Sequence, residues 1–263
     1  MNTGPSQPAR ARPVPLAHRR RRGLPASAAF GWLAAGWRDF LDTPGPSLAY
    51  GLAVFAVSVA VVWTLFALGL DYILFPALAG FMVVGPLVAI GLYQKSRDLA
   101  EGRKPSLARM VFVRAASGPQ VLFTGAILCL LMLLWMRAAV IIYALFFGLR
   151  PFPGLDGVAT MLATTPQGWG MLVVGAVVGG LFAAFSFAVS TFAIPMLLAE
   201  RTDAFTAMGT SISLVWNNLA VMLAWGAIVA VLTALAAATG LIGLIVVFPV
   251  LGHGTWHSYT SIR

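Results

Sequence analysis

The run LFTGAILCLLMLLWMRAAVIIYALFFGL, residues 122–149, decides the fold class of this chain. Its only charged residue is Arg137. A bilayer has a hydrocarbon core of about 30 Å, which takes about 20 apolar residues of α-helix to cross. The run exceeds that length and has no turn-forming residue in its middle. It therefore predicts a transmembrane helix.

The composition extends this conclusion to the whole chain. Of 263 residues, 60% are hydrophobic and only 10% are charged, and the mean hydropathy is +0.90. A soluble domain carries about 25% charged residues. We predict an all-α membrane protein with six transmembrane helices, arranged as three helical hairpins. The six apolar runs lie at about 47–70, 72–93, 120–148, 170–198, 219–238 and 240–256.

Basic residues predict the orientation. They gather in the first 22 residues, in the loop around residues 93–114, and at Arg201 and Arg263, whereas the loops of the other side carry Arg150 alone. Cytoplasmic loops are the ones enriched in Lys and Arg, so both termini should be cytoplasmic. The net charge of +9 follows from this topology, and we expect no nucleic-acid partner.

The chain divides into two parts. Residues 1–25 are rich in Pro and Arg without an apolar period, which predicts a disordered basic cytoplasmic arm. Basic residues of this kind are attracted to anionic lipid. Residues 26–263 form the predicted six-helix transmembrane domain. The single cysteine, Cys129, excludes a disulfide framework.

An internal repeat is visible in the apolar pattern. Two stripes at helical spacing precede the first and fifth spans, a constant 175 residues apart. Each predicts an amphipathic helix lying in the membrane interface. A weaker stripe precedes the third span. The stripes are Phe30, Leu33, Trp37, Phe40 and Leu41, then Phe205, Met208, Ile212, Val215 and Trp216.

The returning span of each pair also carries a proline near its cytoplasmic end, at Pro86, Pro195 and Pro249. The repeated unit is thus an interfacial helix, a span outward, and a span back that contains a proline. Stacked repeats of this kind bury their surfaces against their neighbours.

His253 and His257 are the candidate site near the C-terminus, in LGHGTWHSYTSIR. Residues four apart share one face of a helix. Two ligands are fewer than the four of a structural zinc site or the three of a catalytic one, so no metal site is predicted. The favoured interpretation is that both are interfacial polar residues closing the last helix. A metal or proton-handling role and contact with a partner are the alternatives.

Arg137 is the second candidate, because an ionised group within a span defaults to a functional hypothesis. Its run is longer than a bilayer requires. A rise of about 1.5 Å per residue places Arg137 near the far interface, where its side chain can extend to water. We expect snorkelling or structural pairing, with an anion-binding site as the alternative.

Three blocks, GWRDFLDTPGPSLAYG, GLYQKSRDLAEGRKPSL and FPVLGHGTWHSYTSIR, resemble a bacterial family of predicted integral membrane proteins, domain of unknown function 2189. The resemblance covers residues 28–263. It implies a six-helix protein of the bacterial inner membrane and brings no activity, cofactor or catalytic residue with it.

Three functions are open on this basis. We find no nucleophile elbow, phosphate-binding loop or dinucleotide fingerprint in the sequence. We therefore expect no catalytic residues, no cofactor and a non-enzymatic accessory, scaffold or assembly component, whose partners are the lipid bilayer and other membrane proteins. A small-solute or lipid transporter with a site between repeats is the alternative. A metal- or haem-associated respiratory accessory protein ranks third.

The predicted topology can be tested with reporter fusions. Fusions after residues 105 and 263 should report a cytoplasmic location, and one at about residue 158 a periplasmic location, because basic loops stay in the cytoplasm. A periplasmic C-terminus would contradict the arrangement.

Overall fold

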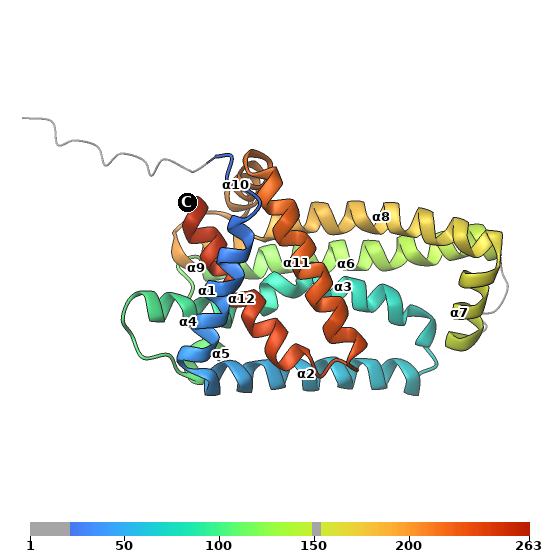
Figure 1. Ribbon diagram of the computed structural model, residues 1–263, viewed down its shortest axis with the longest axis horizontal. Helices are drawn as coiled ribbons and strands as arrows, with labels where there is room; N and C mark the ends of the chain where they lie inside the picture. The colour runs from blue at the N-terminus through green and yellow to red at the C-terminus, as the bar shows by residue number, and fades with distance from the viewer. Residues whose placement is uncertain (1–21, 149–153) are drawn as a thin grey trace, which may run out of the picture.

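The computed structural model describes residues 22–148 and 154–263, which are helical and contain no strand. The predicted basic arm, 1–25, lies outside the described residues except for its last four, and Arg150 lies outside them too. Four helices run along the long axis of the molecule (Figure 1). They are α2 (Pro44–Ala67), α3 (Leu74–Val88), α6 (Gly118–Phe147) and α8 (Pro166–Ser190).

Prolines start and break these helices. Each of α2, α6 and α8 has a proline in its first turn, where the missing N–H costs no helical hydrogen bond. Pro86 lies inside α3, which stops two residues later and continues past Ala89 as α4 (Ile90–Ala100). Pro195 lies in α9 (Ala193–Ala199), which follows α8 after an interruption at Thr191 and Phe192. Each helix is thus interrupted within four residues of a proline.

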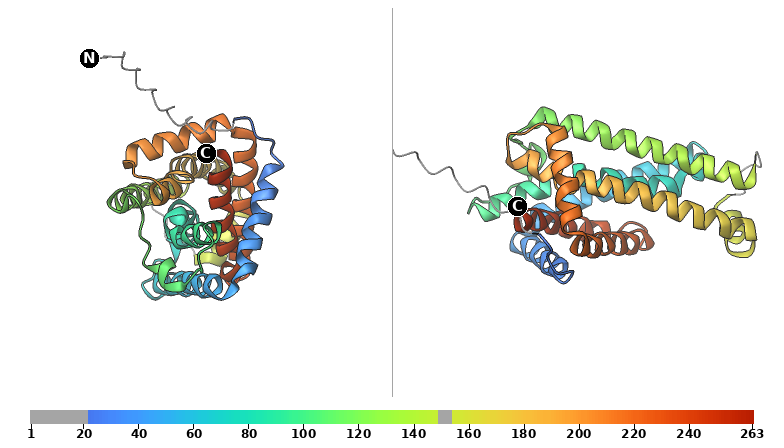
Figure 2. Two further views of the ribbon diagram at one scale, coloured as in Figure 1. Left: turned by 90° about the vertical axis from the view of Figure 1, so that its left-hand side faces the viewer. Right: turned by 90° about the horizontal axis from the view of Figure 1, so that it is seen from above.

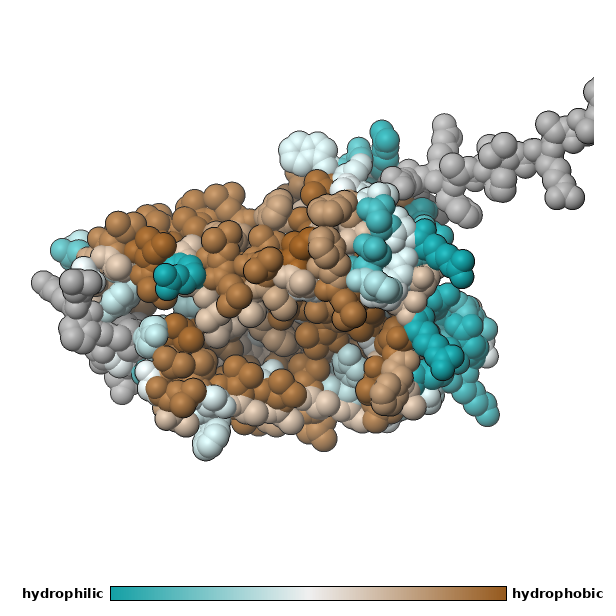
Figure 3. Space-filling view, turned by 180° about the vertical axis from the view of Figure 1, so that it is seen from behind, coloured by the Kyte–Doolittle hydropathy of each residue, from teal (hydrophilic) through white to brown (hydrophobic). Residues whose placement is uncertain are grey.

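Hydrophilic residues gather at one end of the molecule, and apolar residues cover its middle (Figure 3). This polar end carries the C-terminus and the helices α1 (Ala28–Asp42), α4, α5 (Leu107–Val111) and α10 (Ala204–Asn217) (Figures 1 and 2). The opposite end carries α7 (Gly154–Thr164) and the short 3₁₀ helix η1 (Asp71–Ile73).

The 175-residue spacing is present in the helix bounds. Helix α1 ends at Asp42 and α10 at Asn217, a difference of 217 − 42 = 175; the next helices start at Pro44 and Leu219. Large apolar side chains are exposed at matching positions of α1 and α10. They are Phe30, Trp37 and Leu41 on α1, and Phe205, Ile212 and Trp216 on α10.

Five helical segments in the described residues are long and apolar enough to cross a membrane, and the predicted sixth span is not among them. That run forms most of α12 (Leu244–Ile262), whose residues are largely buried inside the protein. The C-terminal half of α12 is polar, which lowers the mean hydropathy of the helix below that of the five segments. The five segments are Pro44–Ala67, Asp71–Ala100, Gly118–Phe147, Pro166–Ala199 and Leu219–Ala238.

The hairpin of α11 (Leu219–Ala238) and α12 crosses the long axis obliquely, and its turn lies part-way along α2 (Figure 1). The backbone of Ile245, at the start of α12, lies against Gly51 of α2. From Gly51, α2 continues for a further 67 − 51 = 16 residues, which at about 1.5 Å per residue is roughly 24 Å. The turn of the hairpin therefore stops well short of the far end of α2.

The helices form two groups. In the first, α12 packs against α1, α2, α4 and α11; in the second, α6 packs against α3 and α8. Glycines allow the closest approaches in the first group. A Cβ atom on Gly36 of α1 would lie 2.5 Å from the Val250 carbonyl oxygen and 2.6 Å from the Gly254 nitrogen of α12. In the second group, the Trp135 ring of α6 packs on Gly179 of α8.

Gly36→Ala should lower the free energy of unfolding by about 1–3 kcal/mol, because the added methyl meets rigid backbone of α12 and overpacks the contact. The measurement is thermal unfolding in detergent. Gly31 is the matched control, since a Cβ there meets no atom within 4 Å. Gly31→Ala should stabilise α1 by about 0.5–1 kcal/mol. Equal melting temperatures for the two variants would contradict the close α1–α12 packing.

Candidate functional site

A buried polar network joins α1, α2, α4 and α12 near the polar end. His253 of α12 is fully buried, and both of its ring nitrogens have partners. The hydroxyl of Ser47 on α2 lies 3.0 Å from Nε2, and that of Ser96 on α4 lies 2.8 Å from Nδ1. The imidazole thus bridges two helices that the sequence separates by about fifty residues.

Lys95, next to Ser96 on α4, is also fully buried. Its Nζ donates three hydrogen bonds: to the Asp39 carbonyl oxygen at 2.9 Å, the Thr43 carbonyl oxygen at 2.7 Å and Ser47 Oγ at 2.7 Å. The two carbonyls close the C-terminal end of α1, where helix carbonyls lack partners and a cation is favourable. The ammonium therefore has an acceptor for each of its three protons.

The position of each shared proton follows from these bonds. An ammonium group only donates, so Ser47 accepts from Lys95 and its own proton points to Nε2 of His253. The proton of the neutral imidazole is then on Nδ1 and is donated to Ser96. This tautomer is assigned from the hydrogen-bond pattern. The imidazole is accordingly neutral in this arrangement.

The network reaches the surface through Asp39 and His257. His257 Nε2 donates to Asp39 Oδ2 at 2.8 Å, and the two side chains are 31% and 16% exposed. Burial raises the pKa of Asp39, but hydrogen bonds from His257 and Ser96 outweigh it and leave the pKa below its usual value. Asp39 is thus a carboxylate at neutral pH. A continuous path runs from the buried ammonium of Lys95 to this carboxylate.

The pair of Ser47 and His253 has the spacing of a hydroxyl nucleophile and its base. Two observations argue against catalysis there. Both side chains are completely buried, and one lone pair of the Ser47 oxygen is occupied by Lys95. The geometry is that of a closed structural network.

The two histidines take different partners and do not form a joint metal site. His253 uses both ring nitrogens on serines, and His257 bonds Asp39. No group of three or more potential metal ligands occurs among the described residues. Arg137 lies exposed on α6, a helix outside this network. That its side chain extends to the membrane interface stays a prediction.

Sequence reasoning missed most of the network. Lys95 and Ser96 lie nine and ten residues after Pro86. The two histidines of α12 lie four and eight residues after Pro249, so the repeated proline did not relate the two pairs. A second missed group surrounds Asp98 of α4, which is buried and accepts both a two-pronged contact from Arg109 and a hydrogen bond from Arg103. That contact holds α5 against α4.

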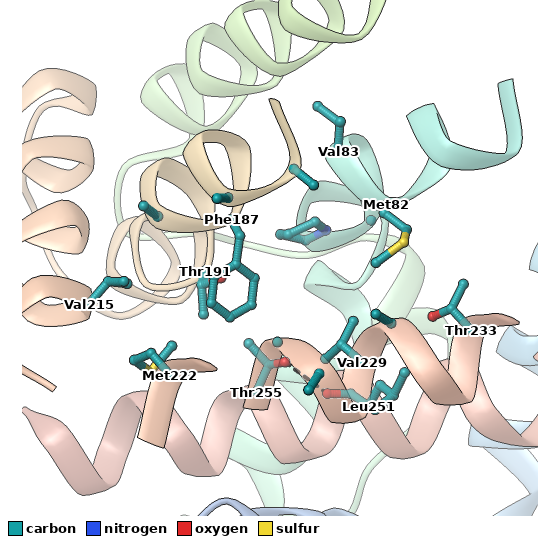
Figure 4. A pocket seen from close by; sticks show the side chains of 18 of the residues that line it. Met82, Val83, Phe187, Thr191, Val215, Met222, Val229, Thr233, Leu251 and Thr255 are labelled. Carbon is teal, nitrogen blue, oxygen red and sulfur yellow. Dashed lines mark hydrogen bonds between the residues drawn. The ribbon is translucent and has the colours of Figure 1, made fainter. Parts of the chain in front are cut away.

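An apolar cavity lies on the other side of α12 (Figure 4). Its volume is about 550 Å³, and α3, α8, α11 and α12 supply most of its wall. From α12, Phe248, Leu251, Gly252 and Thr255 line it. The side chains that surround the space in Figure 4 are mainly hydrocarbon, and the hydroxyl of Thr255 donates to the Leu251 carbonyl of its own helix.

The comparison with protein families agrees with this membrane-type fold. Residues 74–199 match the model of a family described as predicted integral membrane protein (DUF2189). The resemblance predicted from the sequence is thereby confirmed over this segment. No curated protein and no solved structure matches the chain. The matched segment runs from α3 to α9 and includes Lys95, Ser96 and Arg137.

Lys95→Met should lower the free energy of unfolding by about 1–3 kcal/mol, because the substitution leaves buried acceptors at the end of α1 without a donor. Thermal unfolding in detergent measures the change. Lys104→Met serves as the control, since Lys104 is exposed in the loop after α4. A melting temperature for Lys95→Met that equals those of the control and the parent would contradict the capping role of the ammonium.

Proposed function

We propose that this integral membrane protein is a non-enzymatic accessory component of the bacterial inner membrane that holds a lipid acyl chain between its two helix groups. The observation that carries the proposal is the apolar cavity of about 550 Å³ between α3, α8, α11 and α12. This volume lies within the roughly 300–1,000 Å³ of typical small-molecule sites. Its apolar wall suits a hydrocarbon chain and offers no ionised group to a polar solute.

The surroundings of the cavity support a lipid as its occupant. Three of the wall helices, α3, α8 and α11, belong to segments with the length and hydropathy of membrane spans. Helix α11 packs mainly against α12, α1 and α10, and thus away from α3 and α8. Leu219 and Leu223 of α11 line the cavity and are also exposed. The space between the two groups is therefore accessible from the side, where membrane lipid would lie.

The proposed topology puts the polar end in the cytoplasm, with α2, α3, α6 and α8 crossing the membrane. The shallow hairpin of α11 and α12 would enter from the cytoplasmic side and return to it. This places both termini in the cytoplasm, as the six-span prediction also does. The basic residues of the polar end support this orientation through the positive-inside rule.

Helices α1 and α10 would lie in the cytoplasmic interface. Their exposed Phe, Trp, Leu and Ile side chains suit the boundary between head groups and acyl chains. Basic residues at the same end, among them Arg38 and Arg201, would attract anionic lipid head groups. These surfaces support an accessory role at the membrane, and contacts with other membrane proteins belong to the same proposal.

A lipid transporter is the second candidate, and the same cavity favours it. It requires lipid to move through the space between the helix groups rather than stay there. We do not propose the metal- or haem-associated alternative, because both ring nitrogens of His253 already have protein partners.

The proposal is tested by filling the cavity. Gly226 of α11 lines it, and a Cβ atom there meets only the Phe187 ring at 3.9 Å. Gly226→Phe should therefore fold and reduce lipid binding at least about tenfold, since the new ring occupies the space of the chain. The measurement is native mass spectrometry of delipidated protein titrated with phosphatidylglycerol and phosphatidylethanolamine.

Val231→Phe is the matched control on the same helix, because Val231 is exposed and does not line the cavity. It should bind lipid like the parent. If Gly226→Phe and Val231→Phe retain the same number of lipids with the same affinity, the cavity is not the binding site.

A further inference from the structure

We propose that His253 is a proton-binding site whose protonation releases α12 from α1, α2 and α4 and thereby opens the wall of the cavity. The release of α12 follows from the polar network alone. Its effect on lipid rests on the proposed function.

Helix α12 has a polar face and an apolar face, and each belongs to a different site. His253 and His257 point into the polar network, whereas Leu251, Gly252 and Thr255 line the cavity. Gly252 and His253 are adjacent in the sequence, so a rotation or shift of α12 changes both sites together. The Leu92 side chain of α4 packs on Gly252, which fixes the helix from the same direction as Ser96.

The hydrogen bonds leave no room for an added proton on His253. Nε2 already accepts from Ser47, whose oxygen in turn accepts from Lys95. A proton on Nε2 would convert this acceptor into a donor that faces another donor. The Ser47 proton would have to turn away from the ring, and the bond between α2 and α12 would be lost.

Burial of the ring disfavours its charged form most strongly, and the nearest positive charge adds to this effect. Lys95 of α4 opposes a positive imidazole, with only the Ser47 hydroxyl between the two groups. Asp39 of α1 attracts it, and His257 of α12 opposes it once protonated. From α2 the partner is the neutral Ser47, and from α11 the Trp225 ring packs on Gly254. Asp39 is already bonded by His257 and Ser96, so the ammonium is the nearest uncompensated influence.

The added proton can enter only at Nε2, because Nδ1 already carries the proton that it donates to Ser96. Nε2 is free to take a proton only when the Ser47 hydroxyl turns away from the ring. His257 and Asp39 are partly exposed, so water lies close to this part of the network. Protonation and loss of the contact between α2 and α12 therefore occur together.

The sign of the pH dependence follows. In the unfolded or released state, His253 takes up a proton near its ordinary pKa of about 6.5. In the packed state it does not. The released state therefore binds more protons below that pH, and packing of α12 weakens as the pH falls.

The test is amide hydrogen exchange of the α12 peptides in detergent at pH 7.5 and pH 5.0, corrected for intrinsic exchange rates. In the parent, the opening of α12 should increase at least about tenfold on acidification, the change that one pKa unit produces, while α6 stays constant. In His253→Gln the amide can accept from Ser47 and donate to Ser96 without titrating, so the increase should vanish. An equal response in the parent and this variant overturns the proposal.

Ser47→Ala provides a second test should His253→Gln not fold. The substitution removes the hydroxyl that donates to Nε2, so His253 should take up its proton more easily. The pH at which amide exchange of α12 increases should therefore be higher than in the parent. An unchanged or lower midpoint contradicts the proposal. Binding of phosphatidylglycerol at both pH values then separates the two ideas. If the parent binds no phosphatidylglycerol at either pH, the proposed function is wrong, and the pH-dependent opening of α12 is unaffected by that result. Equal affinity at both pH values, together with pH-dependent opening, defeats the link to the cavity.

Discussion

The position of α1 depends on the ammonium of Lys95. This single group closes the C-terminal end of α1, fixes the corner before α2 and holds the hydroxyl that bonds to His253 of α12. A buried lysine is costly unless every proton finds an acceptor. Here two carbonyls and one hydroxyl supply the three acceptors. Four helices are thus placed relative to one another by a charge that cannot be moved to water without unpacking them.

The apolar cavity follows from that placement. Because α12 is bound to α1, α2 and α4, its partner α11 leans towards the same group, and the space beside α3 and α8 is left without a packed helix. The lining is apolar since the polar face of α12 is already committed to the network. The two sites therefore arise from one helix with two chemically different faces.

The fold class and the long spans could be predicted from the sequence, because they depend on local composition. The run that contains Arg137 is α6, and the matching stripes of α1 and α10 are helices with the expected spacing. The network could not be predicted in the same way. Lysine is usually exposed, and the acceptors of Lys95 lie about fifty residues earlier, at Asp39 and Thr43. The oblique course of α11 also escaped prediction, since 20 apolar residues fit a full span and only packing decides the tilt.

The turn between α11 and α12 carries a consequence for bilayer thickness. Several of its polar groups are paired locally: the Thr239 hydroxyl donates to the Ala236 carbonyl and accepts from the Gly243 N–H, and the Leu241 N–H also bonds the Ala236 carbonyl. Hydrocarbon excludes irregular backbone whose polar groups lack partners. A turn that supplies its own partners need not end at a water interface. In the proposed topology, hydrophobic mismatch would act on α2, α3, α6 and α8 and not on the hairpin, so a thicker or thinner membrane would tilt one helix group relative to the other.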